Sequence, residues 1–308
     1  MDSPTFIMMV GLVASGKSTR AKELAKEYNA TIFSSDALRE EMFSDVNDQK
    51  HNQELFVELY RRIKECLRNG KSAIADSTNL SYKKRMSFLR ELKNIPCEKI
   101  CVLMATPYKE CLKRNSERER KVPEYVIERM YRQFDPPYWY EGWDYIIVEY
   151  PNDTKVKSTI DWVLSMKNFN QDNPHHSLTL GEHSEKALDY VFENDTIRDI
   201  EGHSIALRGA AVLHDNGKCF CKTFKNSKGD ITEQAHYYNH EHVGSYNSLF
   251  YKMLCSPLDV AIIIRWHMVP YVWERDNNEK LCGKYHKLWG EQLYQDIMLI
   301  HNADKAAH

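Results

Sequence analysis

The segment Gly11–Ser18 constrains the fold of this chain more than any other stretch. Its sequence, GLVASGKS, has the spacing G-x-x-x-x-G-K-S. The apolar run 6–10 before it is typical of a buried strand, and residues 19–28 after it are typical of a helix. In that setting the glycines let backbone N–H groups turn toward phosphate oxygens, and the helix N-terminus adds partial positive charge. We therefore interpret the segment as a phosphate loop, and we expect the chain to bind ATP or GTP.

The phosphate loop gives its own residues distinct roles. Lys17 would neutralise the β- and γ-phosphates, and the hydroxyl of Ser18 would hold Mg²⁺. The other residues expected to contact the nucleotide are Gly11, Ala14, Ser15, Gly16 and Thr19. The alternative is a glycine-rich turn that arose by chance, and the flanking strand and helix argue against it.

Length and composition are typical of a globular protein with two domains. The chain has 308 residues, of which 42% are apolar and 28% charged. No run approaches the length of about 18 apolar residues that a membrane span needs, and the sequence shows no signal peptide. The eight cysteines form no C-x-x-C pair, so we expect reduced thiols and a cytoplasmic protein. The net charge of −2 argues against a general coat for nucleic acid but is compatible with a local basic site.

The distribution of histidine indicates where the two domains meet. Of the thirteen histidines, only His51 precedes residue 175. The polar segment 168–174 contains a proline and is typical of a linker. We therefore predict domains over residues 1–172 and 173–308, and we assign His175–His176 to the linker rather than to a site.

The first half alternates predicted strands and helices, which favours a parallel sheet with helices on both faces. The helical stretches include 50–69 and 82–94. Functional residues of such a sheet lie at the carboxyl ends of its strands. The predicted strands are 6–10, 31–34, 72–76, 99–105 and 145–149.

Polar motifs follow two of these strands. Asp36 comes after the second strand and would accept a proton from an attacking hydroxyl, with Arg39 one helical turn further on. Alternatively, Asp36 caps the helix that begins at Ala37. The segment Asp76–Asn79 follows the third strand, with Arg85 on the next helix, and its alternative interpretation is a turn with a helix cap.

A basic stretch, Lys113–Lys121, precedes Val122–Pro123. A mobile cationic segment of this kind would close over the phosphates and stabilise the transferred charge. The alternative is a solvated helix face with interleaved glutamates.

Together these motifs resemble the polynucleotide 5′-hydroxyl kinase family of P-loop phosphotransferases. The resemblance rests on G-x-x-x-x-G-K-S, S-D-x-x-R, D-x-T-N and R-N-x-x-R followed by V-P. It implies that Asp36 is the general base for a 5′-hydroxyl and that Arg39 holds the neighbouring phosphate of the acceptor. It also implies that Arg118 reaches the donor phosphates from the basic stretch. The acceptor pocket would be shaped by Asp76, Thr78, Asn79 and Arg85.

The second half carries histidines and aspartates on successive predicted helices. An adjacent pair, His214–Asp215, supplies a nitrogen and a carboxylate to a cation, and the carboxylate can bridge to a second ion. A single buried histidine is more often a core residue than a ligand. Here the pattern recurs, so that each helix of a bundle would present a ligand inward. The further members are His183, His240, His267 and Asp304.

This series resembles the HD phosphohydrolase superfamily, and its H-D-x-G-K form is similar to the phosphodiesterase members. The resemblance implies an all-α domain in which one metal is bound by His183, His214, Asp215 and Asp304. A second metal would add His240 and His267 and share Asp215; His242 is the rival of His240. Mn²⁺, Fe²⁺, Co²⁺, Ni²⁺ and Zn²⁺ suit such ligands, and Mg²⁺ is compatible with them. A bound metal would activate water and stabilise charge on phosphoryl oxygens.

Lys218 lies one helical turn after His214. It would contact the substrate phosphate, or alternatively it is an exposed surface lysine.

An α/β P-loop kinase domain followed by an HD domain indicates a bifunctional enzyme that repairs RNA or DNA ends. The first half would phosphorylate a 5′-hydroxyl with ATP or another nucleoside triphosphate, and the second would remove a 2′,3′-cyclic, 2′- or 3′-phosphate. An RNA ligase would then act downstream. Two alternatives are a nucleoside kinase fused to a nucleotidase, and an ATP-binding regulatory module whose second half only senses a nucleotide. The complete ligand set argues against the second alternative.

Overall fold

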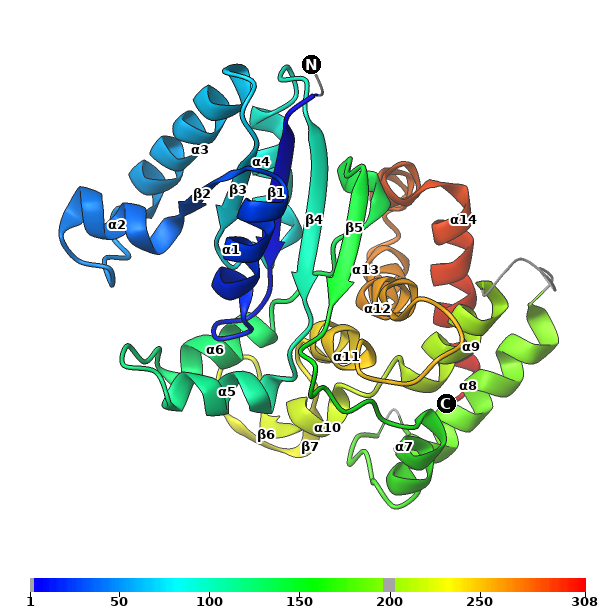
Figure 1. Ribbon diagram of the computed structural model, residues 1–308. Helices are drawn as coiled ribbons and strands as arrows, with labels where there is room; N and C mark the ends of the chain where they lie inside the picture. Colours follow the sequence, from blue (N-terminus) through cyan, green and yellow to red (C-terminus); the bar gives the residue numbers. More distant parts are fainter. Residues whose placement is uncertain (1–2, 175, 196–202) are drawn as a thin grey trace. The chain divides into compact units, whose positions relative to one another are not determined.

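The computed structural model describes residues 3–174, 176–195 and 203–308, and the chain divides into two compact units (Figure 1). Unit 1 comprises Met1–Met130 and Pro137–Thr154, and unit 2 comprises Tyr131–Pro136 and Lys155–His308. This division differs from the boundary predicted near residue 172, because the helix before it packs against the helix after it. The polar segment 168–174 is therefore a loop inside unit 2.

Unit 1 contains the predicted parallel sheet. Its five strands have the order β2-β3-β1-β4-β5, and all neighbours are parallel. All five predicted strands are confirmed to within one residue at each end. Their bounds are β1 (Thr5–Val10), β2 (Thr31–Ser34), β3 (Ala73–Asp76), β4 (Glu98–Met104) and β5 (Tyr145–Glu149).

Helices cover both faces of this sheet (Figure 1). Successive side chains of β1 point to opposite faces. Ile7 packs in a core with Leu24 of α1, whereas the ring of Phe6 stacks on Phe88 of α4, with centroids 5.0 Å apart. The helices of unit 1 are α1 (Lys17–Glu27), α2 (Ser35–Phe43), α3 (Asn52–Arg68), α4 (Tyr82–Glu91), α5 (Tyr108–Ser116) and α6 (Glu124–Tyr131), with the short 3₁₀ helix η1 (Trp139–Glu141).

Unit 2 is mostly helical, as predicted, but it also contains two short strands that an all-α domain would lack. Its strands β6 (Thr223–Lys225) and β7 (Ile231–His236) form an antiparallel hairpin around Asn226–Asp230. Among the described residues, none of the helices is long and apolar enough to cross a membrane. The helices of unit 2 are α7 (Thr159–Met166), α8 (Leu180–Asn194), α9 (His203–Leu213), α10 (Lys218–Cys221), α11 (His240–Ser248), α12 (Pro257–Trp266), α13 (Val269–Arg275) and α14 (Glu279–Ala306).

A buried ion pair ties α4 to η1 in unit 1. The guanidinium of Arg85 donates to both carboxylate oxygens of Glu141 at 2.6 and 2.8 Å, and neither side chain is exposed to solvent. The same guanidinium donates to the carbonyls of Asn79 and Leu80 at 3.1 and 3.0 Å. Such a pair contributes mainly through the cost of leaving one partner alone.

Replacing Arg85 by alanine would leave the buried Glu141 carboxylate without its cation. We expect the free energy of unfolding to fall by about 3–5 kcal/mol, measured by urea denaturation of the full chain. Arg90→Ala removes an exposed arginine from the same helix and is the matched control, with an expected change within about 0.5 kcal/mol. Equal stability of the two variants would contradict this role.

Candidate phosphate-binding site and metal centre

The phosphate loop lies between β1 and α1, as its spacing predicts. Gly16 precedes the helix with φ +96°, a conformation that favours glycine. Its carbonyl accepts the N–H groups of Thr19 and Arg20, each at 3.1 Å. The loop therefore places the N-terminus of α1, with its unsatisfied N–H groups, at the carboxyl end of β1.

Lys17 folds back over this loop. Its ammonium donates to the carbonyl of Leu12 at 2.6 Å and to Ser15 Oγ at 3.3 Å. Burial lowers the pKa of Lys17 to about 8, although Asp76 opposes this shift. A buried ammonium with few carboxylate neighbours is well suited to phosphate oxygens.

Asp36 follows β2 within the first turn of α2. Its alternative role as the helix cap is wrong, because the Ser34 hydroxyl accepts the N–H of Ala37 at 3.5 Å as the N-cap of α2. Instead the Asp36 carboxylate lies between two guanidinium groups. Arg39 donates to Oδ1 at 3.1 Å, and Arg120 donates to Oδ2 at 2.8 Å.

The basic stretch forms the end of α5 and the loop before α6. Asn115 holds this loop through two hydrogen bonds with the backbone of Val122, at 2.8 and 3.0 Å. Arg118 is exposed, and its charge acts on Lys17, where it contributes to the lowered pKa. Sequence reasoning did not single out Arg120, whose partner Asp36 lies far away in the chain.

The residues predicted to shape the acceptor pocket lie in different surroundings and make different contacts. Asp76 is buried at the end of β3, and its charge acts on Lys17. The carbonyl of Thr78 accepts the N–H of Gly11 at 3.1 Å, and Asn79 donates to the carbonyl of Met9 at 2.9 Å. These two residues therefore support the phosphate loop. The prediction that Arg85 contacts the acceptor is wrong, because its guanidinium is fully buried against Glu141 and carbonyls.

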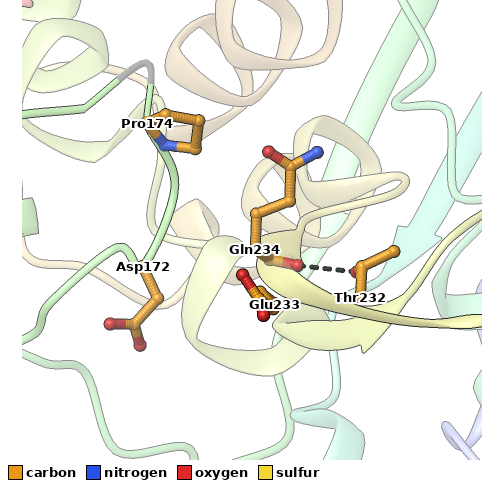
Figure 2. A pocket seen from close by; sticks show the side chains of 5 residues that line it. All are labelled: Asp172, Pro174, Thr232, Glu233 and Gln234. Carbon is orange, nitrogen blue, oxygen red and sulfur yellow. Dashed lines mark hydrogen bonds between the residues drawn. The ribbon is translucent and has the colours of Figure 1, made fainter.

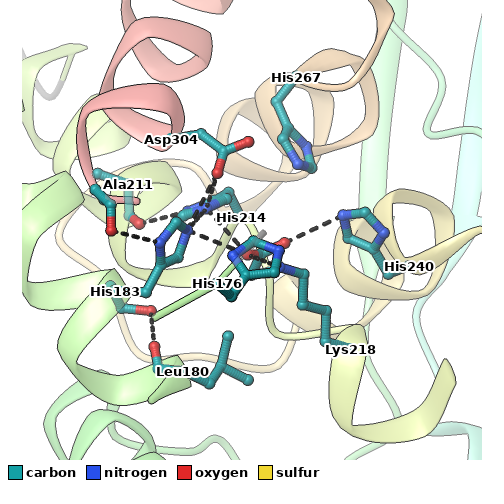
Figure 3. A network of polar contacts seen from close by, with 12 residues as sticks. His176, Leu180, His183, Ala211, His214, Lys218, His240, His267 and Asp304 are labelled. Carbon is teal, nitrogen blue, oxygen red and sulfur yellow. Dashed lines mark hydrogen bonds and ion pairs between the residues drawn. The ribbon is translucent and has the colours of Figure 1, made fainter. Parts of the chain in front are cut away.

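The histidines and aspartates of unit 2 converge in its interior (Figure 3). One group of possible ligands consists of His183, His214, Asp215 and Asp304, and a second consists of Asp215, His240 and His267, all of them buried. Within each group the candidate ligand atoms lie within 4.8 Å of one another. Asp215 belongs to both groups, as a bridging carboxylate would.

Backbone carbonyls fix the orientation of all four imidazole rings. The Nδ1 atoms of His214, His240 and His267 lie 2.8, 3.0 and 2.6 Å from the carbonyl three residues earlier in the chain. His183 Nδ1 lies 3.2 Å from the carbonyl of Ala307. A carbonyl only accepts, so Nδ1 carries the proton and Nε2 presents its lone pair. Metal-binding histidines are usually oriented in this way.

The Nε2 atoms face acceptors rather than donors. His183 Nε2 lies 3.0 Å from His214 Nε2, 3.1 Å from Asp304 Oδ1 and 3.3 Å from Asp215 Oδ2. His267 Nε2 is buried and has no hydrogen-bond partner among the described residues. Lone pairs and carboxylates this close repel one another unless protons or a metal ion lie between them. The donor set thus fits one or two divalent transition metals.

The electrostatics of the centre agree with that requirement. Burial alone would raise the pKa of Asp215, yet Lys218 and the imidazoles hold it well below its usual value. Burial would lower the pKa of His214, but the carboxylates of Asp215 and Asp304 raise it to about 10. A proton on Nε2 therefore meets the same need for positive charge, and a bound metal would displace it. Anionic carboxylates are the form that a metal ion binds.

Lys218 and His176 lie next to this centre. Lys218 is buried, and its ammonium lies 2.7 Å from Asp215 Oδ2, 2.8 Å from Gln171 Oε1 and 3.2 Å from His176 Nε2. Its alternative as an exposed surface lysine is therefore wrong. The assignment of His176 to a linker is also wrong, because its ring centroid lies 5.7 Å from that of His183. His175 lies outside the described residues.

Contacts behind the ligands hold the centre in shape. The hydroxyl of Tyr271 donates to Asp304 Oδ2 at 3.0 Å and so orients a candidate ligand. Gly217 is the glycine of the H-D-x-G-K motif, and a Cβ there would lie only 2.0 Å from the carbonyl oxygen of His240. This close approach brings α11 and its first residue, His240, against Asp215. In the sequence, the glycine of the H-D-x-G-K motif is the feature that indicates this close approach.

A surface pocket of about 640 Å³ in unit 2 differs from both sites (Figure 2). Its lining includes the carboxylates of Asp172 and Glu233 but no lysine, arginine or histidine. Asp172 is paired with Lys222 at 2.6 Å, and the lining itself offers no cation to a phosphate, so the pocket is not a candidate phosphate site.

Comparisons with known proteins give a family model and relatives. Residues 6–137 match the model of a family described as an AAA domain. The chain is 32% identical over 145 residues to the L-seryl-tRNA(Sec) kinase of Methanococcus maripaludis, which covers 45% of this chain and 55% of that protein. It is 23% identical over 211 residues to protein kti12 of Schizosaccharomyces pombe, which covers 63% of this chain and 73% of that protein.

Unit 1 is thus a P-loop kinase-like domain. The chain spans about half the length of the first of these relatives. Among solved structures, a chain of the Pnkp1/Rnl/Hen1 RNA repair complex is 20% identical, with a TM-score of 0.39, over 42% of this chain and 43% of that chain.

The two histidines at the start of α11 provide a test of the metal centre. His240 Nε2 lies 3.1 Å from Asp215 Oδ1, whereas His242 Nδ1 lies 2.7 Å from the carbonyl of Phe134. We expect His240→Ala to weaken binding of added Mn²⁺ by about tenfold or more, because a ligand is lost. His242→Ala is the matched control and should bind Mn²⁺ like the unaltered chain. Binding is measured by the electron paramagnetic resonance signal of free Mn²⁺, and weakening by His242→Ala alone would contradict the assignment.

Proposed function

We propose that the chain is a bifunctional enzyme that heals nucleic-acid ends. Unit 1 transfers phosphate from ATP to a 5′-hydroxyl, and unit 2 removes a 2′,3′-cyclic phosphate or the 2′- or 3′-phosphate that remains. The observation that carries this proposal is that one chain holds both a P-loop and a buried histidine–aspartate cluster that could hold metal ions. The product carries the 5′-phosphate and 3′-hydroxyl that a ligase joins.

The residues of unit 1 support phosphoryl transfer in which the protein stabilises charge and forms no covalent bond to the phosphoryl group. Lys17 and the N–H groups at the start of α1 would hold the donor phosphates, and Ser18 would hold Mg²⁺. The acceptor oxygen forms a bond to the γ-phosphorus, its proton passes to Asp36, and the bond to the β-phosphate oxygen breaks to release ADP. The partly exposed carboxylate of Asp36, whose charge acts on Lys17, supports this role.

The residues of unit 2 support hydrolysis at phosphorus. His183, His214, Asp215 and Asp304 would hold one divalent cation, and His240 and His267 would hold a second that shares Asp215. Such cations supply Lewis-acid activation of water and phosphate. Lys218 holds Asp215 in place beside the substrate, and Tyr271 orients Asp304. Addition of water opens the cyclic phosphate, and a second addition releases inorganic phosphate.

The similarity to an L-seryl-tRNA(Sec) kinase favours a second acceptor for unit 1. The 32% identity supports an acceptor hydroxyl on an aminoacyl group attached to RNA, in place of the hydroxyl at a 5′ end. A nucleoside kinase joined to a nucleotidase is the remaining alternative, in which both units would act on mononucleosides and mononucleotides. These candidates differ in the acceptor of unit 1, so one kinase assay with several acceptors separates them.

We expect the two activities to be separable by single substitutions. Lys17→Ala should reduce transfer from labelled ATP to a 5′-hydroxyl oligoribonucleotide by about 100-fold or more, because the charge on the donor phosphates is no longer stabilised. Asp215→Ala should abolish hydrolysis of an oligonucleotide with a cyclic-phosphate end in the presence of Mn²⁺, Ni²⁺ or Zn²⁺.

Each variant is the control for the other, because it should retain the activity that the other loses. Loss of both activities in one variant that still folds would contradict two independent sites. If seryl-tRNA or free nucleosides were phosphorylated and the oligonucleotide were not, the proposed acceptor would be wrong.

A further inference from the structure

The segment Tyr131–Pro136 lies between parts of unit 1 in the sequence but belongs to unit 2, and we call it the strap. Its aromatic side chains are buried against α11. The Tyr131 hydroxyl donates to Asn247 Oδ1 at 2.5 Å. The rings of Tyr131 and Phe134 meet Tyr246 edge to face, with centroids 5.5 and 4.8 Å apart. Because both strap rings are closed off from solvent, the strap is part of the core of unit 2.

The strap also carries a buried carboxylate, Asp135, that joins α11 to α12. Arg265 of α12 donates from Nε to Asp135 Oδ1 at 2.6 Å, and the same oxygen lies 3.5 Å from Nδ1 of His242 in α11. His242 Nδ1 also donates to the carbonyl of Phe134, at 2.7 Å, because a carbonyl only accepts. Two neighbouring residues of the strap therefore hold both helices at once.

The helix positions that the strap holds are next to ligands of the second candidate cation. His242 comes two residues after His240, and Arg265 comes two residues before His267. The rings of His240 and His267 have centroids 5.4 Å apart, and their candidate ligand atoms lie close to Asp215 (Figure 3). A shift of α11 against α12 would therefore change the distance between the two imidazoles that this cation needs.

The first candidate cation has supports of its own. His183 Nδ1 lies 3.2 Å from the carbonyl of Ala307, just after α14, and the Tyr271 hydroxyl of α13 donates to Asp304 Oδ2 at 3.0 Å. These contacts use other elements than α11 and α12. Loss of the contacts made by the strap should therefore affect one cation and spare the other.

We propose that Asp135 is a positioning residue that sets the distance between His240 and His267 and so allows the second cation to bind. It acts through Arg265 and His242, and it does not touch the cation. This inference rests on the proposed function of unit 2 and deepens it, because it makes the two-cation form of the centre depend on the strap. A cut at the boundary predicted near residue 172 would take this support away from the centre.

The test counts bound ions and does not depend on turnover. The full chain is titrated with Mn²⁺ in the absence of nucleotide, and electron paramagnetic resonance spectra are recorded. Two Mn²⁺ ions that share a carboxylate give an exchange-coupled signal, which distinguishes the paired centre from an ion bound alone elsewhere. We expect this signal in the unaltered chain. Asp135→Ala should raise the Mn²⁺ concentration that it requires about tenfold, because the support behind two ligands is lost, and should leave the affinity for the first ion unchanged.

Two further variants complete the test. Asp135→Asn keeps an oxygen that accepts from Arg265 but loses the charge, so it should weaken the second ion less than alanine does, and it decides the test if Asp135→Ala does not fold. Asp189→Ala removes an exposed aspartate from α8 and is the matched control, with both ions bound as in the unaltered chain.

Three results would overturn the proposal: no folded Asp135 variant changes the coupled signal, the variants weaken both ions equally, or the unaltered chain never shows a coupled signal. A coupled signal that depends on Asp135, in a chain that hydrolyses no phosphate ester, would instead count against the proposed function alone.

Discussion

The cost of removing charge from water is the constraint on which both centres depend. A charged group inside a protein needs a partner of opposite charge or several hydrogen bonds. Lys17 has only a carbonyl and a hydroxyl as hydrogen-bond acceptors in its loop, and burial lowers its pKa. Asp215 and Asp304 are carboxylates enclosed by imidazole rings. The first arrangement is complementary to an anion, and the second is complementary to a cation.

The candidate metal centre uses the same local arrangement at several of its histidines. Three of its four histidines place Nδ1 against the carbonyl three residues earlier, which directs Nε2 away from their own backbone. This arrangement occurs where a helix begins or ends. His214 follows α9, His240 begins α11 and His267 follows α12. Because these helix ends converge, each ring presents its lone pair to the same region. The close approach at Gly217 allows that convergence.

Features set by short segments could be predicted from the sequence. The five strands of unit 1 and the phosphate loop depend on apolar runs and on a fixed spacing, and both are found as expected. The contact between Arg120 and Asp36, by contrast, joins residues 84 positions apart, and no pattern in either segment predicts it. Arg85 was misplaced for the same reason, since Glu141 decides its burial from 56 positions away. The hairpin β6–β7 was missed because its strands are short and largely polar.

This difference between local and distant contacts separates two kinds of function in unit 1. Binding of donor phosphates needs backbone N–H groups and one lysine, all within a single loop, so proteins with quite different substrates can share it. Asp36 and Arg39, which would face the acceptor in the proposed reaction, meet Arg120 only in the complete fold. The position of Arg120 beside Asp36 therefore depends on how the loop between α5 and α6 docks onto α2. Substitution of Asn47, whose side-chain oxygen accepts from Arg120 Nε at 3.2 Å, would remove one of the contacts that hold Arg120 there, whereas the contact with Val46 uses a backbone carbonyl that every residue has.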